Sequence, residues 1–188
     1  MRVLFKTLYW LFAAALIAAA ALGSIVLRRS HQMETTIASA AARRGIDPRL
    51  FAALVEECSG GRTTFADHER YGLLALSAED ARIWAEQNGV EPDTFTLFDP
   101  KQNLRIGAWK LDQALATWSR ERDPRIWALA GWKTNRETVR VWAAAARGAT
   151  GDPVRAISDS HARNFVRDIL GKTRREEFTL VLPWGRKR

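Results

Sequence analysis

The segment from Asp47 to Gly61, DPRLFAALVEECSGG, constrains the fold of this 188-residue chain most strongly. Asp47 is a favoured helix N-cap, and Pro48 suits the first helical position, where its missing N–H is not needed. Apolar side chains then recur at helical spacing: Leu50, Phe51, Leu54, Val55 and Cys58. Gly60 ends the helix, because glycine accepts the left-handed C-cap conformation. The sequence therefore predicts a short buried helix that delivers Cys58 to the start of a loop, a common position for functional side chains.

Further helices are expected from capping residues and from helical periodicity. Ser77 is a favoured cap for a helix over residues 77–87. Asp99 and Pro100 repeat the earlier start signal and open a helix in which Gly107 permits close packing. Within the segment Ile126–Ala146, Val139, Val141 and Trp142 continue a helical pattern. Because 47% of the residues are hydrophobic and glycine and proline are few, we expect one helix-rich globular domain of the all-α class.

The chain is basic, with 29 lysines and arginines against 21 acidic residues and a net charge of +8. A basic balance favours anionic partners such as phospholipid headgroups, nucleic acid or anionic cell-wall polymers. No aromatic-rich basic motif accompanies the charge, which argues against nucleic acid as the partner. The single cysteine excludes an intrachain disulfide. His31, His68 and His161 lack metal-ligand spacing, so we expect no metal site and no cofactor.

Residues 7–27 form an apolar, uncharged run between Lys6 and Arg28. About 20 apolar residues suffice for a helix to cross the hydrocarbon core of a membrane. A cleaved signal peptide is the alternative, because the small residues that end at Gly23 form an acceptable cleavage site. The run continues past that site to Leu27, which favours an uncleaved anchor. We divide the chain accordingly: residues 1–29 as anchor or signal sequence, 30–171 as the helical domain and 172–188 as a C-terminal tail.

The run from Asp47 to Gly60 resembles the first catalytic-domain helix of the soluble lytic transglycosylases (SLT), relatives of goose-type lysozyme. Their pattern is roughly D-P-x-L-(apolar)-x-A-(apolar)-(apolar)-x-x-E-S-G. Further blocks similar to the family follow in the same order: Tyr71–Ala81, Asp99–Leu111, Ala128–Asn135 and Ala162–Val166. The resemblance implies an all-α, lysozyme-like domain that acts on peptidoglycan glycan strands. It also implies a bacterial inner-membrane protein whose domain faces the periplasm.

The chain departs from the family at positions that face substrate. The family's single catalytic glutamate falls on Cys58, and a substrate-facing glutamine falls on Ala75. A Tyr-Asn pair of the family becomes Trp132 and Lys133. The resemblance implies further substrate-binding positions: Ser59, Tyr71, Gly72 and Leu73. The packing residues of the same blocks are kept, which indicates a scaffold that was retained while selection for glycan cleavage lapsed.

The departure at Cys58 bears directly on catalysis. In the family, one glutamate protonates the glycosidic oxygen and then acts as a base, which leaves a 1,6-anhydro product. Acid–base catalysis contributes about 10²–10⁴ in rate, so loss of that single group should be severe. A thiol is a poor replacement, because its ordinary pKa is about 8.5 and its side chain is shorter than that of glutamate.

Three interpretations of Cys58 follow. We favour a retired catalytic position in a pseudoenzyme that binds peptidoglycan or an envelope-complex partner. The second interpretation keeps an active lytic transglycosylase and moves the acid to Glu57, although Glu57 points about 100° away from Cys58 on an ideal helix. The third gives the thiol a new activity, but no histidine stands at a recognisable activating distance along the chain. A purely structural subunit of an envelope assembly is a further class to be tested.

The C-terminal tail combines an apolar run, Phe178–Trp184, with basic clusters on both sides. Three roles are open to it. The run could pack back on its own domain, which we favour. It could add as a strand to the sheet of an envelope protein partner. The third possibility is that Trp184 and the terminal basic residues touch the membrane surface.

Overall fold

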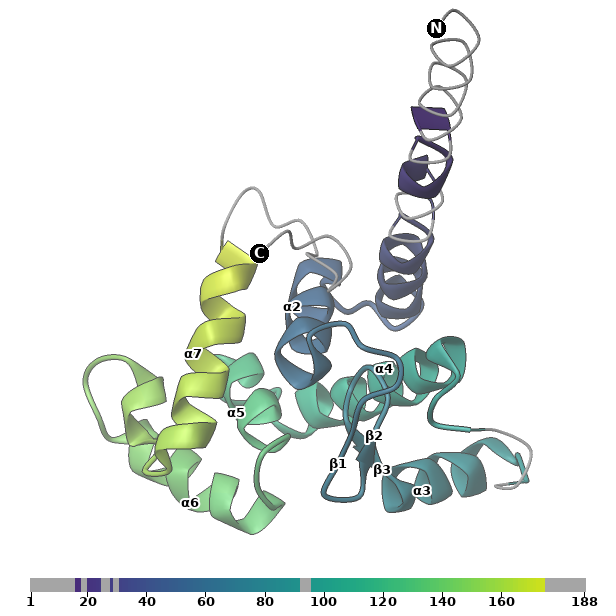
Figure 1. Ribbon diagram of the computed structural model, residues 1–188. Coiled ribbons are helices and arrows are strands. Elements are labelled where there is room, and N and C mark those ends of the chain that lie inside the picture. The colour runs from purple at the N-terminus through teal and green to yellow at the C-terminus, as the bar shows by residue number, and fades with distance from the viewer. Residues whose placement is uncertain (1–15, 18–19, 25–27, 29–30, 92–95, 175–188) are drawn as a thin grey trace, which may run out of the picture.

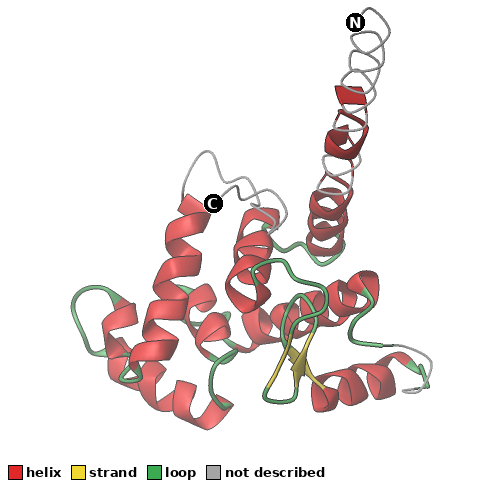
Figure 2. Cartoon of the chain, in the orientation of Figure 1, coloured by secondary structure: helices red, strands yellow, loops and turns green. Residues whose placement is uncertain are grey.

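The computed structural model describes residues 16–17, 20–24, 28, 31–91 and 96–174. Residues 31–42 are helical. The elements that follow are α2 (Pro48–Ser59), β1 (Ala66–Asp67), β2 (Arg70–Tyr71), β3 (Leu76–Ser77), α3 (Ala78–Asn88), α4 (Pro100–Thr117), α5 (Pro124–Ala130), α6 (Arg136–Arg147), the 3₁₀ helix η2 (Pro153–Ala156) and α7 (Ser160–Arg174). Helices dominate the arrangement (Figure 1), and the three strands form one small sheet beside them (Figure 2).

The helix boundaries follow the capping residues. At the start of α2, the Asp47 carboxylate accepts a hydrogen bond from the N–H two residues later at 2.8 Å. Gly60 ends α2 in the left-handed conformation, with a φ of 63°. Asp99 caps α4 in the same way as Asp47 caps α2, at 2.8 Å from the N–H three residues later. Ser77 and Asp80 form a reciprocal capping box at the start of α3. The predicted starts of these three helices are therefore confirmed.

The small sheet is not among the elements expected from the sequence. Its order is β1-β2-β3, with antiparallel pairing throughout. Tyr71 is the shared member, opposite Ala66 on one side and Leu76 on the other. Each strand has two residues, which is too short for the alternation of polar and apolar residues that marks a strand in a sequence.

The core gathers the apolar faces of several helices. Leu104, Ile106 and Leu111 of α4 are each 0% exposed. Trp127 of α5 is 2% exposed, and α5 packs against α4. The helices α2 and α7 lie side by side, so the beginning and the end of the domain are in contact (Figure 1). The site described below lies at the end of α2, on this packed framework.

The predicted membrane segment, residues 7–27, lies mostly outside the described residues. Its described parts, 16–17 and 20–24, are helical and exposed. Within the ranges that the structure describes, no helix combines the length and the apolar character needed to span a bilayer. At the other end, α7 continues to Arg174, so the first three residues of the segment assigned to the tail are helical. The apolar run Phe178–Trp184 lies outside the described residues.

Candidate functional site

Cys58 lies in the last turn of α2, just before the chain turns into the loop that leads to β1. Its side chain is 8% exposed and belongs to the continuous hydrophobic core. The helix exit that the sequence predicts for Cys58 is therefore present. The thiol itself is buried, which limits the contact that it can make with a ligand.

The surroundings of Cys58 oppose ionisation of the thiol. Burial raises the pKa of Cys58 to about 12, and the nearby charge of Glu57 adds to the rise. The positive charges of Lys133, Lys110 and Arg70 act in the opposite direction without overcoming burial. At neutral pH the group is therefore a protonated thiol, which is neither a nucleophilic thiolate nor an acid of useful strength.

Glu57, the alternative acid, is bound to another helix. Its Oε2 lies 2.8 Å from the Nζ of Lys172 on α7, and the neighbouring Glu56 Oε1 lies 3.1 Å from the same nitrogen. Burial lowers the pKa of Lys172, but hydrogen bonds to the two glutamates outweigh that effect and raise it. Lys172 thus links α2 to α7, and the Glu57 carboxylate is directed towards this link.

The segment that follows β2 is held in place by Asn103 of α4. The Asn103 side chain is 0% exposed. Its Nδ2 donates to the carbonyls of Tyr71 and Leu97, both at 2.9 Å, and its Oδ1 accepts from the N–H of Leu74 at 2.9 Å. Buried amide groups need such partners, so this side chain fixes the path of the segment.

Two glycines allow the segment to lie this close to α4. Gly72 has a φ of +74°, and a Cβ on it would lie 2.2 Å from the Leu97 carbonyl oxygen. A Cβ on Gly107 would lie 2.0 Å from Leu74 Cδ1. Both contacts are shorter than any that atoms can make without displacement. The close packing that the sequence predicts for Gly107 is therefore confirmed, and Gly72 has a backbone role.

The remaining positions predicted to bind substrate in this segment differ in their exposure. Tyr71 is half-buried, with its ring edge-on to Phe98 at 5.6 Å between centroids. Leu73 is 0% exposed and Ser59 is 3% exposed. The Ser59 hydroxyl donates to a carbonyl of its own helix at 3.3 Å. Ala75 is 7% exposed, and its backbone has a φ of +48°. In this structure only Tyr71 of these four side chains has an appreciable surface for a ligand.

Trp132 and Lys133, which follow α5, have different environments. The Trp132 side chain is 2% exposed, and its Nε1 donates to the Leu74 carbonyl at 3.1 Å. The Nζ of Lys110 lies 4.9 Å from the centroid of its ring. Lys133 is exposed and lies 4.4 Å from the centroid of the Phe165 ring. Trp132 is therefore a packing residue, whereas Lys133 is accessible to a ligand.

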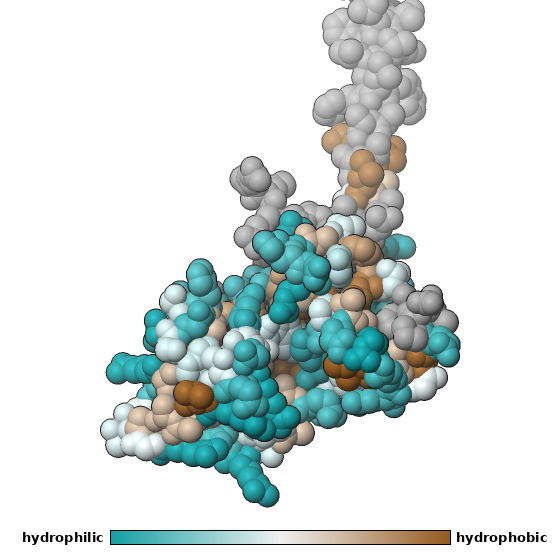
Figure 3. All heavy atoms as spheres, turned by 90° about the horizontal axis from the view of Figure 1, so that it is seen from below, coloured by the Kyte–Doolittle hydropathy of each residue, from teal (hydrophilic) through white to brown (hydrophobic). Residues whose placement is uncertain are grey.

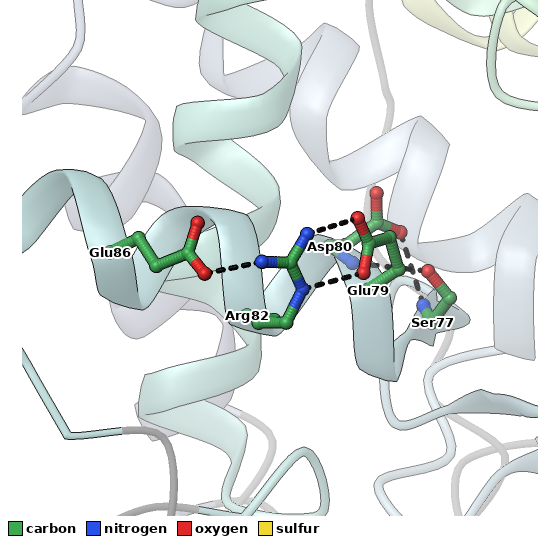
Figure 4. Close-up of polar contacts among 5 residues, drawn as sticks. All are labelled: Ser77, Glu79, Asp80, Arg82 and Glu86. Carbon is green, nitrogen blue, oxygen red and sulfur yellow. Dashed lines mark hydrogen bonds and ion pairs between the residues drawn. The ribbon is translucent and has the colours of Figure 1, made fainter.

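Lys110 also forms an ion pair that the sequence did not predict. Its Nζ lies 2.7 Å from Oδ1 of Asp80, the residue that completes the capping box with Ser77 at the start of α3 (Figure 4). Burial raises the pKa of Asp80, but the charge and hydrogen bonds of Lys110 and the bonds from Ser77 outweigh burial and lower it. On the exposed side of α3, Arg82 pairs with Glu79 and Glu86 (Figure 4).

Most of the charged groups that act on Cys58 are positive. Around a neutral thiol lie the cations of Lys133, Lys110 and Arg70. Such surroundings suit hydrogen bonding to anionic or neutral oxygen atoms rather than proton donation. In the part of the chain that the structure describes, no group of three or more histidine, cysteine, aspartate and glutamate side chains is arranged to hold a metal ion.

Several residues that shape the site were not among those predicted from the sequence: Arg70, Asp80, Asn103, Lys110 and Lys172. One signal was available for two of them. Asn103, Gly107 and Lys110 recur at intervals of four and three residues, which places them on one face of α4. That face carries the segment after β2. No local pattern could have paired Lys172 with Glu57, because the two are 115 positions apart.

The chain is similar to known proteins both in sequence and in structure. The family model of the transglycosylase SLT domain matches residues 35–152. The structure resembles an inactive glutamate-to-glutamine mutant of the lytic transglycosylase Slt from Pseudomonas aeruginosa, with a TM-score of 0.63 and 21% identity over 74% of this chain and 23% of that one. It also resembles the 70 kDa soluble lytic transglycosylase of Escherichia coli, with a TM-score of 0.63 and 20% identity over the same shares.

These structural matches concern the fold. At 20–21% identity they establish a shared lysozyme-like architecture. This chain spans 23% of the length of either solved protein. No curated protein sequence matches the chain.

Proposed function

Because the chain belongs to the transglycosylase SLT domain family, we propose that it is a transglycosylase-like protein of the bacterial envelope that binds peptidoglycan with little or no cleavage of the glycan. The proposal also includes binding to a protein partner within an envelope complex. The protein would then retain the family's framework and use it for attachment rather than for turnover. Binding requires accessible polar groups, whereas cleavage also requires a proton donor at the scissile bond.

The observation that carries the proposal is the thiol at the end of α2. Cys58 stands at the position of the family's catalytic glutamate, is 8% exposed and has a pKa raised by burial to about 12. A general acid works best when its pKa lies near the ambient pH, and the loss of such a group costs about 10²–10⁴ in rate. A buried thiol of this pKa does not meet that requirement.

The geometry of Glu57 supports the same proposal against an active enzyme. Its carboxylate accepts a hydrogen bond from Lys172 at 2.8 Å, on the side of α2 that packs against α7. To act as the acid, Glu57 would have to leave this ion pair and rotate about the helix axis towards Cys58. The residue thus has a structural role that explains its presence without catalysis.

A binding role is supported by the cations near Cys58. Lys133 is exposed, and Lys110 and Arg70 lie close enough to influence the thiol. Peptidoglycan carries carboxylates on its peptide stems and hydroxyls on its sugars, and both groups accept hydrogen bonds from cationic donors. The half-buried ring of Tyr71 adds an aromatic surface on which a sugar ring could lie.

We also propose that residues 7–27 anchor the protein in the inner membrane, with residues 30–171 as the domain in the periplasm. The length and apolar character of this run support an anchor. The apolar run in the tail, Phe178–Trp184, is a candidate contact for an envelope protein partner. Both assignments rest on the sequence alone.

Digestion of purified cell-wall sacculi tests the proposal. We expect the wild-type protein to release no anhydro-muropeptides above the blank and to sediment with the sacculi. Glu57→Gln should behave in the same way, after a thermal melt has shown that it remains folded without its bond to Lys172. Anhydro-muropeptides released by the wild type and lost in Glu57→Gln would instead identify an active enzyme. Failure of the folded protein to sediment with sacculi would favour the purely structural subunit.

A further inference from the structure

A second surface of the domain carries a concentration of positive charge. It is a groove of about 800 Å³ between the helix of residues 31–42 and α4. The groove shares no residue with the surroundings of Cys58. An inference about it therefore does not depend on the function proposed for that site.

The charged side chains that line the groove are all basic. They are Arg43, Arg44, Lys101 and Arg105, and no acidic residue joins them. Arg44 is paired with Asp112 at 3.3 Å, which leaves three cations that no carboxylate in the groove lining offsets. The surface should therefore attract an anionic ligand.

Two of these cations, Arg105 and Lys101, are side chains of α4. The guanidinium of Arg105 lies 5.0 Å from the centroid of the Trp84 ring, an arrangement that fixes a cation over an aromatic face. Lys101 lies in the first turn of α4, which contains no acidic residue. A helix N-terminus is already electropositive, so Lys101 adds charge where the helix itself disfavours a cation. Helix stability does not explain a lysine there, whereas an anionic ligand would.

The floor and walls of the groove narrow the choice of ligand. The apolar residues beside the groove are Ala40, Leu104 and Ala108. Leu104 and Ala108 are buried, so Ala40 is the one of these three with accessible surface, and its small side chain leaves room for a backbone to approach. Ser39 and Gln102 add a hydroxyl and an amide, the groups that bind peptide N–H and C=O groups. A lone phosphate would occupy only a small part of a groove of about 800 Å³.

One face of the domain is seen from below in the space-filling view (Figure 3). It is mostly hydrophilic, with small and separate apolar areas (Figure 3). Among the described residues of the folded domain, the large exposed apolar side chains are Phe98, in the connection between α3 and α4, and Val141 on α6. A broad apolar docking surface is therefore not a feature of this face.

We propose that the groove between residues 31–42 and α4 binds a short acidic peptide segment of a protein partner in extended form. The carboxylates of the segment meet Arg43, Lys101 and Arg105, and its backbone lies beside Ser39, Ala40 and Gln102. From Thr36 to Arg43 the helix rises about 10 Å. That distance accommodates about three extended residues, so an acidic residue at every second position would face the cations.

Fluorescence anisotropy tests the proposal with the full chain in detergent and a labelled peptide of alternating glutamate and alanine. The double variant Arg43→Gln/Lys101→Gln should bind the peptide about tenfold more weakly than the wild type, because each exposed ion pair contributes up to about 1 kcal/mol. Ser39→Trp, which narrows the groove without a change in charge, should also weaken binding. The matched control Arg120→Gln/Arg155→Gln removes the same charge outside the groove and should bind as the wild type does. Thermal melts establish that each variant is folded.

Several results would overturn the proposal. One is an equal loss of binding in the groove variant and the matched control, since that reports net charge alone. Another is equal binding of a peptide that carries glutamine in place of glutamate. Full competition by inorganic phosphate at concentrations comparable to the peptide would point to a free anion site. Loss of binding to phosphatidylglycerol vesicles in the groove variant, with no peptide binding by the wild type, would point to a lipid surface. Sacculus binding should be unchanged in the groove variant, which separates this test from that of the proposed function.

Discussion

Position 58 carries a thiol, and the burial of that thiol decides what the side chain can do. Cys58 is 8% exposed, and burial raises its pKa to about 12. The cations of Lys110 on α4, Arg70 on β2 and Lys133 after α5 act on it, yet they do not make it a thiolate. The same cations would have been suitable neighbours for a glutamate.

The rate at which Cys58 is alkylated tests whether its thiol is buried. In the folded protein, alkylation by iodoacetamide should be slow and should keep rising with pH beyond pH 10, because the thiolate forms only near the raised pKa of about 12. In concentrated urea the same thiol should react with an apparent pKa of about 8.5. The loss of free thiol can be followed by mass spectrometry. A folded protein whose alkylation rate levels off near pH 8 would contradict a buried thiol.

Restoring the acid alone should not restore catalysis. We expect Cys58→Glu to release no anhydro-muropeptides from sacculi, because under the proposed function Ala75 and Lys133 also stand in place of substrate-facing residues of the family. The new carboxylate would also be placed where the native side chain is 8% exposed, which costs free energy unless the nearby cations pair with it. Robust turnover by this single variant would show that the rest of the site is intact. A thermal melt of the variant controls for loss of the fold.

At the scale of elements, ion pairs between helices connect the parts that carry the site. Lys110 of α4 pairs with Asp80 at the start of α3 at 2.7 Å, and Lys172 of α7 pairs with Glu57 of α2 at 2.8 Å. All four side chains are between 17% and 26% exposed. Partly buried pairs of this kind matter mostly when one partner is removed, because the other is left without its counter-charge.

The Asp80 pair should therefore give a measurable pH dependence. Asp80→Asn should lower the free energy of unfolding by about 1–3 kcal/mol at pH 7, since Lys110 loses its partner and α3 loses part of its cap. The folded-state pKa of Asp80 lies below its ordinary value of 3.8. Its contribution is then complete above that value and is lost as the pH falls through the folded-state pKa. Urea denaturation between pH 7 and pH 3 measures both effects.

The control for this test is Glu79→Gln on the exposed side of the same turn, which should change stability far less. The difference in unfolding free energy between the wild type and Asp80→Asn should become smaller as the pH falls towards 3. A difference that stays constant between pH 7 and pH 3 would mean that the charge of Asp80 does not contribute to stability.

The molecule as a whole could be predicted from its sequence where local chemistry decides the structure. The first residues of α2, α3 and α4 could be predicted from Asp47, Ser77 and Asp99, because an N-cap side chain bonds to N–H groups only two or three residues away. The small sheet could not be predicted, since two-residue strands carry no periodic signal. The cations around Cys58 come from distant parts of the chain, so only the folded structure shows that they meet.

The same limit applies to the candidate site. The sequence identified Cys58, Ala75, Trp132 and Lys133 as departures from a family pattern, but it could not tell which of them remain accessible. Trp132 is 2% exposed because its indole N–H bonds to a carbonyl 58 positions earlier. Lys133, its neighbour in the chain, is exposed. Accessibility is decided by packing partners, and these are set by the fold.

Deletion of residues 1–29 tests the division of the molecule into an anchor and a domain. We expect the shortened protein to be recovered in the soluble fraction and the full chain in the membrane fraction, because the deleted part contains the apolar run of residues 7–27. The two proteins should have the same midpoint of thermal unfolding in one detergent, since residues 31–174 contain the hydrophobic core. Mass spectrometry of the full chain from cells determines whether a signal peptide is removed after Gly23. A full chain that is soluble and uncleaved would contradict an anchor.

The way in which Asn103 holds the segment after β2 has a consequence for protein engineering. All three of its hydrogen bonds end on main-chain atoms of Tyr71, Leu74 and Leu97, so the path of the loop does not depend on which side chains the loop displays. A combinatorial library at position 71 would therefore vary the display surface without moving its support. The domain could serve as a scaffold for selecting new carbohydrate binders, with Asn103, Gly72 and Gly107 left unchanged.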